Sequence, residues 1–355
     1  MQPTPQVSGL QAARLPSWEQ GAAQPHPRDV LLGAQAQAGF IPVCDHYSGV
    51  EARMRKSLQL QADMIREFGT CVFDVTLDCE DGAPVGFESD HARRVAALAL
   101  EAAPGARVAA RVHAVDHPAF ANDIAVIAGQ AGERLCHIMV PKVESVDDVL
   151  LAERAIDQAC STVLPIHVLI ESPAAVHRAF EIAAHPRVQS ISFGLMDFVS
   201  AHAGAIPARG MTSQGQFEHP LVVRAKLEIA AACHAHGKVP SHCVVTEFSD
   251  ERAMQSAASK AASELGYTRM WSIHPAQIRP ILQAFAPQQD DIDSAANIVL
   301  AAANADWAPI SVNGTLHDRA SYRFYGQVLE RAHNTGRALP LSVRHWFDAP
   351  AIACP

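Results

Sequence analysis

Two acidic residues, Glu171 and Asp197, each close an apolar run of the sequence that turn residues bound. A short apolar run of this kind is typical of a strand buried on both faces of a parallel sheet. A carboxylate at the end of such a strand lies where α/β folds place their chemistry. Two carboxylates on neighbouring strand ends can hold a hard divalent cation such as Mg²⁺. Either residue alone is better explained as a cap of the following helix, and the other strand ends reverse that preference.

Charged residues also follow the other apolar runs. An acidic cluster that contains Glu80 and Asp81 follows the second run, the third run carries Arg111, and the fourth ends in Lys142. Because parallel strands of a barrel bring their carboxyl ends to one face, we expect these side chains to meet at one mouth and to contact a substrate. The alternative for each cation is a structural ion pair, Arg111 with an acid of the cluster and Lys142 with a neighbouring glutamate.

Elements that could position these residues alternate along the chain. Eight candidate strands are 40–44, 71–79, 107–114, 137–143, 165–171, 190–197, 238–244 and 270–274. Helical periodicity lies between them, over 51–68, 89–103, 146–159, 174–184, 221–236 and 249–265. At roughly 30 residues per unit, this α/β pattern predicts a (β/α)₈ TIM barrel. An open doubly wound sheet is the alternative, and the absence of GxGxxG after the first strand disfavours it.

Three segments follow from this pattern. Residues 1–38 are rich in Pro, Gln, Ala and Gly and predict a loosely ordered N-terminal lead-in. Residues 39–284 form the predicted barrel, which is the catalytic domain. Residues 285–355 predict a C-terminal helical lid and tail, with helices at 290–304 and 319–334.

The bulk composition excludes several classes of protein. A net charge of −9 without a basic block disfavours nucleic acid as a partner. We find no secretory signal and no transmembrane span, so no membrane association is expected. The eight cysteines are scattered without a CxxC pair, which is typical of free thiols in a reducing cytoplasm. We therefore expect a cytoplasmic protein.

Six short motifs stand in order at the predicted strand ends. They are Asp78-x-Glu80-Asp81, Arg111-Val, Pro141-Lys-Val-Glu-Ser145, Ile170-Glu-Ser-Pro173, Phe193-Gly-x-x-Asp197 and Ile273-His-Pro-Ala-Gln277. Together they resemble the citrate lyase beta subunit / malyl-CoA lyase family. That family comprises Mg²⁺-dependent lyases of the phosphoenolpyruvate/pyruvate barrel superfamily. The resemblance covers about residues 40–335.

The resemblance implies roles for named residues. Glu171 and Asp197 would ligate Mg²⁺, with Mn²⁺ as an alternative, and Arg111 would contact the substrate. Glu80 and Asp81 would lie near the metal and its waters. In the acyl-CoA lyases of the family, a lid aspartate acts as acid/base in a neighbouring subunit's site. Asp318, in Gly314-Thr-Leu-His-Asp318, matches that setting loosely. We therefore expect a homo-oligomer, either a trimer or a hexamer.

The resemblance also implies the reaction, a carbon–carbon lyase acting on a small hydroxy-dicarboxylate. The substrate would be a CoA-type thioester resembling malyl-, citramalyl- or citryl-CoA. The family's first-strand loop, which helps bind CoA phosphates, is rewritten here as residues 42–49, and His46 within it is expected to contact the substrate. Two alternatives therefore stay open. One is an aldolase that uses free pyruvate or glyoxylate without CoA, and the other is a lyase subunit that needs an acyl carrier protein.

Overall fold

The computed structural model describes residues 26–32 and 41–347. These residues form two compact units, which we describe separately. The barrel unit comprises residues 41–287 and 331–338, and the terminal unit comprises residues 26–32, 288–330 and 339–347. Most of the predicted lead-in over residues 1–38 lies outside the described residues.

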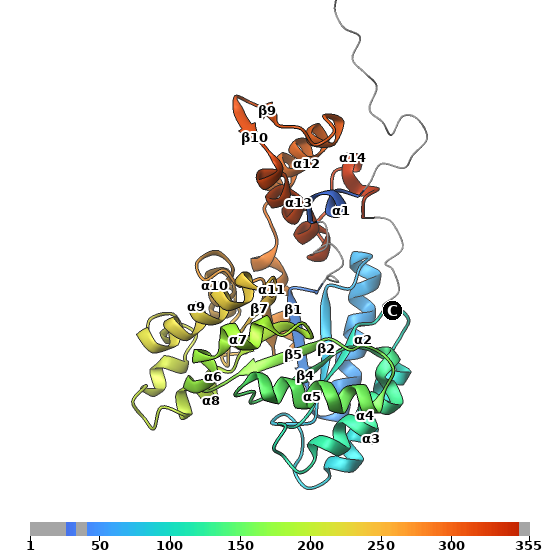
Figure 1. Cartoon of the computed structure of the whole chain (residues 1–355), viewed down its shortest axis with the longest axis vertical. Coiled ribbons are helices and arrows are strands. Elements are labelled where there is room, and N and C mark those ends of the chain that lie inside the picture. The colour runs from blue at the N-terminus through green and yellow to red at the C-terminus, as the bar shows by residue number, and fades with distance from the viewer. Residues whose placement is uncertain (1–25, 33–40, 348–355) are drawn as a thin grey trace, which may run out of the picture. The chain divides into compact units, whose positions relative to one another are not determined.

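The barrel unit contains a closed parallel barrel, as the sequence predicts (Figure 1). Its strands, in spatial and chain order, are β1 (Cys44–Ser48), β2 (Phe73–Asp78), β3 (Val108–Arg111), β4 (Leu135–Val140), β5 (Ile166–Ile170), β6 (Val188–Phe193), β7 (Val239–His242) and β8 (Arg269–Ser272). The ring closes because β1 pairs in parallel with both β2 and β8. The carboxyl ends of all eight strands therefore lie on one face, which we call the mouth.

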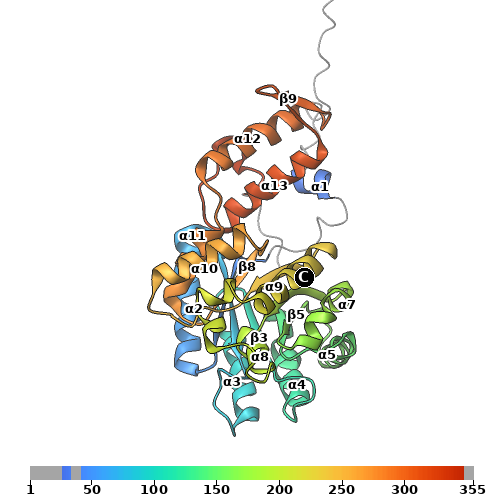
Figure 2. The same cartoon turned by 90° about the vertical axis from the view of Figure 1, so that its left-hand side faces the viewer.

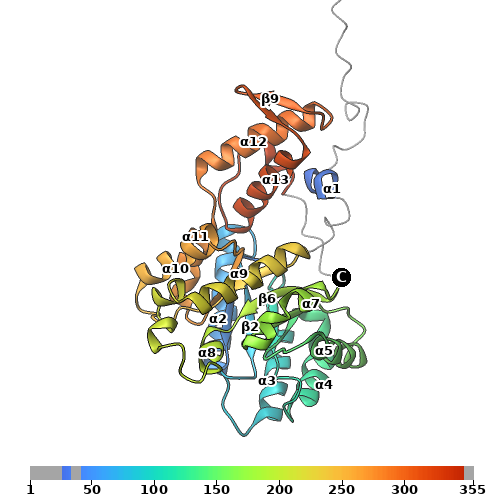
Figure 3. The same cartoon turned by 60° about the vertical axis from the view of Figure 1, so that its left-hand side comes forward.

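Helices surround the strands of the barrel (Figures 2 and 3). They are α2 (Glu51–Phe68), α3 (Glu88–Glu101), α4 (Phe120–Ala131), α5 (Val146–Ala159), α6 (Pro173–His177), α7 (Ala179–Ala184), α8 (Leu195–Ser200), α9 (Pro220–Ala235), α10 (Glu251–Ser263) and α11 (Ile278–Phe285). Short 3₁₀ turns lie at Gly132–Arg134, Ala208–Met211, Gly215–Phe217 and Pro275–Gln277. The main apolar core lies between strands and helices, where the outward side chains of the strands meet the apolar stripes of the helices.

Local sequence signals begin two of the helices beside the mouth. Ser145 and Asp148 form a capping box at the start of α5. At α6 the Ser172 hydroxyl accepts a hydrogen bond from the backbone N–H of Ala175 at 3.0 Å, and Pro173 occupies the first turn. Each cap fixes where its helix begins, so the residues between strand and helix lie at the mouth.

The first strand differs from its prediction. The apolar run over 40–44 was the expected strand, but β1 is Cys44–Ser48 and consists of mostly polar residues. Those polar residues can be buried because neighbouring barrel residues supply their ion-pair and hydrogen-bond partners. Asp45 lies 2.8 Å from Arg269 Nη2 and accepts a hydrogen bond from Thr76 at 2.6 Å. Apolar periodicity cannot locate a strand whose inward side chains are buried ion-pair partners.

A layer of buried charge crosses the barrel interior at this level. Arg269 Nη2 also lies 2.7 Å from Asp74 Oδ2, and Arg107 Nε lies 2.6 Å from Asp74 Oδ1. Both aspartates and Arg269 are inaccessible to solvent. Two guanidinium groups therefore balance two carboxylates, as a buried charge requires.

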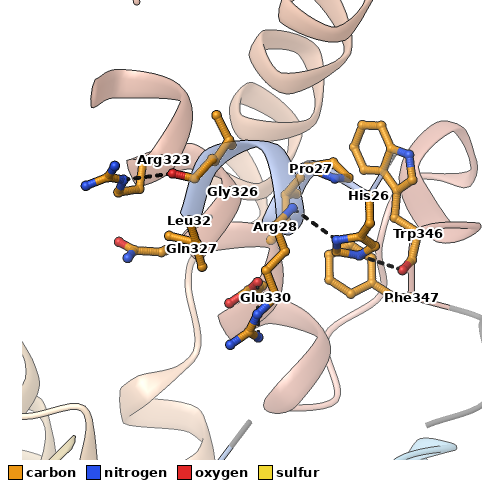
Figure 4. A pocket seen from close by; sticks show the side chains of 12 residues that line it. His26, Pro27, Arg28, Leu32, Arg323, Gly326, Gln327, Glu330, Trp346 and Phe347 are labelled. Carbon is orange, nitrogen blue, oxygen red and sulfur yellow. Dashed lines mark hydrogen bonds and ion pairs between the residues drawn. The ribbon is translucent and has the colours of Figure 1, made fainter. Parts of the chain in front are cut away.

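The terminal unit contains helices α1 (Pro27–Leu32), α12 (Gln289–Asn304) and α14 (Leu341–Arg344), a hairpin of β9 (Ile310–Val312) and β10 (Thr315–His317), and most of α13 (Arg319–Asn334). Leu31 of α1 packs in a small core with Ile298, Ala302 and Tyr322. Arg323 donates to the Leu31 carbonyl at 3.2 Å. Figure 4 shows α1 against α13, with His26 hydrogen-bonded to the Trp346 carbonyl at 2.8 Å. A segment near the N-terminus thus completes a unit built from C-terminal residues.

No helix in the described ranges is both long enough and apolar enough to cross a membrane.

Candidate active site

Glu171 and Asp197 come together at the mouth. Glu171 follows the last residue of β5, and Asp197 lies in the first turn of α8, just after β6. The two strands are neighbours, with Ile170 opposite Phe193. Gly194 lies between them, and a Cβ there would be 2.5 Å from Glu171 Cγ and 3.0 Å from Oε2. Glycine at position 194 therefore leaves the space that the Glu171 carboxyl occupies.

The surroundings of Glu171 disfavour its charged form. The residue is 5% exposed, and burial, a hydrogen bond with Asp197, and the charges of Asp197 and Glu80 raise its pKa to about 9. An opposing contact is the backbone N–H of Lys142, which donates to Glu171 Oε1 at 3.2 Å. Two carboxyl groups that share a proton can instead share a cation.

Lys142 makes two kinds of contact at the mouth, one through its backbone N–H and one through its side-chain Nζ. It adopts a left-handed backbone conformation, with φ of 53°, which is costly for a residue with a side chain. In that conformation its N–H reaches Glu171, while Nζ lies 2.5 Å from Glu80 Oε1 and 3.8 Å from Asp81 Oδ1. The structural ion pair foreseen for Lys142 is therefore present, and Glu80 and Asp81 belong to the same group.

Arg111 is held by two acids of the cluster. Its Nε and Nη2 donate to the two oxygens of Asp78 at 2.7 and 2.5 Å, and Nη1 lies 3.0 Å from Glu80 Oε2. Burial opposes the charge of Arg111, but the two carboxylates outweigh it and raise the pKa of the guanidinium. The Asp78 carboxylate also accepts the backbone N–H groups of Glu80 and Gly82, which fixes the loop after β2. Arg111 is thus a permanently charged, oriented group.

The mouth carries more negative than positive charge. The residues concerned are Asp78, Glu80, Asp81, Glu171, Asp197, Arg111 and Lys142. Five carboxyl groups therefore face two cations. An anionic substrate would be repelled unless additional positive charge is present. Oxygen donors with an excess of negative charge are the ligands that a hard divalent cation prefers, so the donor set fits such an ion.

A second group of potential metal ligands lies inside the barrel rather than at the mouth. Asp45, His137 and His167 place ligand atoms within 4.8 Å of one another. Arg269 already pairs with Asp45 at 2.8 Å, and the two imidazoles stack at 3.5 Å. Because the charge of this aspartate is already neutralised by a guanidinium, a divalent cation here would add buried charge without compensation. This interior group is therefore poorly suited to a divalent cation.

His46 lies apart from the charged group. Its ring is buried, Nδ1 lies 2.9 Å from the Ser272 hydroxyl and Nε2 lies 3.0 Å from the Ser57 hydroxyl. Burial lowers the pKa of His46 to about 4. With both nitrogens engaged between β1, β8 and α2, the imidazole joins strand to helix. The structure thus places His46 in a structural setting and not among the side chains of the mouth.

Asp318 lies in the terminal unit, directly before α13. Its Oδ1 accepts the backbone N–H groups of Ala320 and Ser321 at 3.0 and 3.3 Å. These contacts are those of a helix N-cap. Its catalytic role stays a prediction.

Two aromatic residues lie beside Arg111 at the mouth. Tyr47 and Trp271 lie on the neighbouring strands β1 and β8, and both contact the guanidinium of Arg111. Aromatic residues at the ends of buried strands read as ordinary core residues. Only the three-dimensional position of Arg111 distinguishes them.

Comparison with known proteins gives consistent matches. The family model described as HpcH/HpaI aldolase/citrate lyase matches residues 57–275, a range that contains five of the six motifs and the start of the sixth. The L-malyl-CoA/beta-methylmalyl-CoA lyase of Cereibacter sphaeroides is 31% identical over 239 residues, which cover 62% of this chain and 75% of that protein. The predicted family resemblance is confirmed.

Solved structures agree with the fold. A citrate lyase from Burkholderia xenovorans LB400 is 46% identical with a TM-score of 0.73, covering 92% of this chain and all of that one. CitE from Mycobacterium tuberculosis, solved with magnesium, acetoacetate and coenzyme A, is 22% identical with a TM-score of 0.61. The match covers 82% of this chain and 98% of that one, and it shows a shared fold.

Proposed function

The chain belongs to the HpcH/HpaI aldolase/citrate lyase family and is a lyase, and we propose that it cleaves or forms a carbon–carbon bond with the help of Mg²⁺. The proposed substrate is a small hydroxy-dicarboxylate carried as a CoA-type thioester, resembling malyl-, citramalyl- or citryl-CoA. The observation that carries the proposal is the pairing of Glu171 with Asp197 beside the oriented Arg111 at one mouth.

Glu171 and Asp197 are the proposed ligands of the cation. Mn²⁺, which shares the preference for oxygen ligands, is the proposed alternative. When bound, such an ion supplies Lewis-acid polarisation of the substrate's hydroxyl or oxo oxygen and neutralises its carboxylate. The magnesium reported with CitE from Mycobacterium tuberculosis supports the choice of ion.

The chemistry of cleavage defines what the residues must do. The bond between the carbinol carbon and the carbon next to the thioester breaks, and its electron pair remains on the thioester half as an enolate. The hydroxyl passes its proton to Asp318, the proposed acid/base, and becomes the carbonyl of an oxo-acid. Arg111 is the proposed donor to the enolate oxygen, because its two outer N–H groups are not used by Asp78 or Glu80.

Lys142, Glu80 and Asp81 are proposed to shape the charge around the substrate. Lys142 Nζ lies between the two acids, so it limits their repulsion of an anionic substrate. The left-handed conformation of Lys142 directs its N–H at Glu171, so this residue supports the proposed metal ligand as well.

Asp318 is proposed as the acid that protonates the enolate carbon, delivered from a neighbouring subunit of a homo-oligomer, either a trimer or a hexamer. The support is the family resemblance of the Gly314–Asp318 segment, and the N-cap contacts leave Asp318 Oδ2 for such a role. Light scattering with a mixed-subunit assay tests this. Full activity of a monomer would remove the role.

A free-acid aldolase is the second candidate. It is favoured by β1, whose carboxyl end carries buried Tyr47 and Ser48 in place of a loop with free donors for CoA phosphates. A subunit that needs an acyl carrier protein is the remaining alternative. Calorimetric titration with CoA separates the free-acid aldolase from the thioester lyase, since a free-acid aldolase has no CoA site.

The deciding experiment is a cleavage assay of purified protein with malyl-, citramalyl- and citryl-CoA, in Mg²⁺ and in EDTA, with oxo-acids detected by mass spectrometry. EDTA-sensitive release of glyoxylate, pyruvate or oxaloacetate supports the proposal and identifies the acyl half. If none of the three thioesters releases an oxo-acid in the presence of Mg²⁺, the proposal of a CoA-thioester substrate is refuted. Free acids and a carrier protein are then tested.

A further inference from the structure

Arg111 is fixed along its edges by carboxylates, but its flat faces need separate support. Asp78 and Glu80 both lie on β2 or in the loop that follows it, so they restrain the guanidinium from one side. A planar guanidinium with free faces can tilt about that side and carry its outer N–H groups away from a substrate oxygen. The residues that cover its faces therefore decide where those donors point.

Two aromatic rings lie next to the guanidinium. The Arg111 Cζ lies 5.4 Å from the ring centroid of Tyr47 and 6.0 Å from that of Trp271. Both distances are within the range in which a cation is attracted to an aromatic face. Because the mouth is only slightly exposed here, with Arg111 at 6%, Tyr47 at 6% and Trp271 at 7%, the attraction is weakly screened by water.

The two rings are themselves held firmly. Their centroids are 4.6 Å apart at an interplanar angle of 30°, and Trp271 Nε1 donates to the Ser192 hydroxyl at 2.8 Å. They form a small apolar cluster with Met139 and Leu169, separate from the main core. Both residues stand on paired barrel strands rather than on loops. The cluster is thus a rigidly held apolar group next to Arg111.

The hydroxyl of Tyr47 does not explain why a tyrosine occupies this position. Its oxygen is buried and has no hydrogen-bond partner within residues 26–32 and 41–347. A buried hydroxyl without a partner costs stability, so a phenylalanine would pack here at least as well. The ring is therefore the part of Tyr47 that acts on Arg111.

We propose that Tyr47 and Trp271 are positioning residues, which restrain the guanidinium of Arg111 by cation–π attraction and so direct its two unused N–H groups at the reacting oxygen. This proposal rests on the proposed function only in naming that oxygen. The stacking itself is independent of any substrate, and the experiment below tests the two parts separately.

The kinetic test compares two substitutions of Tyr47. Tyr47→Leu removes the ring and is expected to lower kcat about tenfold with little change of KM, the size of one desolvated cation–π contact. Tyr47→Phe restores the ring and is expected to recover that loss. In an Arg111→Met background, Tyr47→Leu should cost less than about twofold, because there is no guanidinium to position. An equal loss in both backgrounds would overturn the proposal.

The substrate-free test uses urea unfolding in EDTA. Tyr47→Leu and Arg111→Met should shift the midpoint non-additively, because each removes the same contact. Additive shifts would refute the stacking whatever the activity is. Non-additive shifts without turnover of any thioester would keep the stacking and reject the proposed function.

Two further variants guard against misfolding. Trp271→Leu removes the second ring and serves if Tyr47→Leu does not fold, with the same expected fall in kcat. Phe73→Leu removes a fully buried ring from the main core, where it contacts no part of Arg111. It should lower the unfolding midpoint and leave kcat within about twofold. A comparable fall in kcat for Phe73→Leu would show that loss of packing alone explains the Tyr47 result.

Discussion

Replacing Glu171 by glutamine should stabilise the protein when no metal is present. The raised pKa of Glu171, about 9, means that the folded protein holds a proton that the unfolded chain releases above its ordinary pKa of 4.5. Stability from this group is complete below pH 4.5 and falls as the pH rises toward 9. At pH 7 the loss spans about 2.5 pH units, which corresponds to about 3 kcal/mol. Glutamine keeps the shape of the protonated acid and removes the loss.

Urea unfolding in EDTA measures this directly. At pH 7 the free energy of unfolding of Glu171→Gln should exceed that of the wild type by up to about 3 kcal/mol, whereas at pH 5 the difference should fall below about 1 kcal/mol. With Mg²⁺ the order should reverse. A ligand at one thousand times its Kd stabilises the wild type by about 4.1 kcal/mol, which exceeds the advantage of about 3 kcal/mol that the variant has in EDTA, and the variant should gain nothing.

A matched control isolates the effect of the paired carboxyl groups. Glu144→Gln removes a neighbouring acid that accepts the Ser172 hydroxyl at 2.7 Å and lies outside the Glu171–Asp197 pair. It should show neither the stabilisation in EDTA nor the loss of the Mg²⁺ response. If Glu171→Gln instead destabilises the metal-free protein at pH 7, or responds to Mg²⁺ as the wild type does, the assignment of this pair is refuted.

Other predictions test the remaining parts of the argument. Gly194→Ala places a Cβ 2.5 Å from Glu171 Cγ, and calorimetry should find Mg²⁺ or Mn²⁺ affinity reduced at least about tenfold; unchanged affinity would contradict the close approach. The pKa of His46 is lowered to about 4 in the folded protein. The stability that this group contributes is therefore complete above pH 6.5, and up to about 3 kcal/mol of it is lost as the pH falls to 4. His46→Gln should flatten the stability curve in that window, and an unchanged slope would refute this. Leu31→Asp should expose the terminal unit to limited proteolysis and cost about 2 to 5 kcal/mol in that unit; wild-type protease resistance would argue against the role of α1.

The barrel could be predicted because short apolar runs alternate regularly with segments of helical periodicity. β5 shows this clearly, since it is apolar except for His167 and Ser172 caps the helix that follows. The ends of β5 and β6 place Glu171 and Asp197. β1 could not be located in the same way, since its inward residues are Asp45 and Tyr47 and its outward residues include His46. Their burial depends on partners from β2, β8 and α2, which periodicity does not contain.

The same reasoning separates the site residues that could be found from those that could not. Charged residues at strand ends stand out because burial of a charge is costly, so Arg111 and Lys142 were visible as candidates. Their partners were not determined, because Asp78, Glu80 and Asp81 are close in sequence and equally plausible. The structure assigns Asp78 to Arg111 in a two-point contact and gives Glu80 to both cations.

From the arrangement of charge we infer that substrate binding and the proposed metal binding are coupled in this barrel. Asp78 and Glu80 engage three nitrogens of Arg111, and Lys142 is occupied by Glu80, so neither cation offers its full charge to a substrate. The remaining carboxyl pair, Glu171 and Asp197, adds no positive charge. Under the proposed function, a cation held by that pair gives the mouth the positive charge that a dicarboxylate requires. A variant that lacks the pair should therefore lose substrate binding together with the metal, even though Arg111 remains in place.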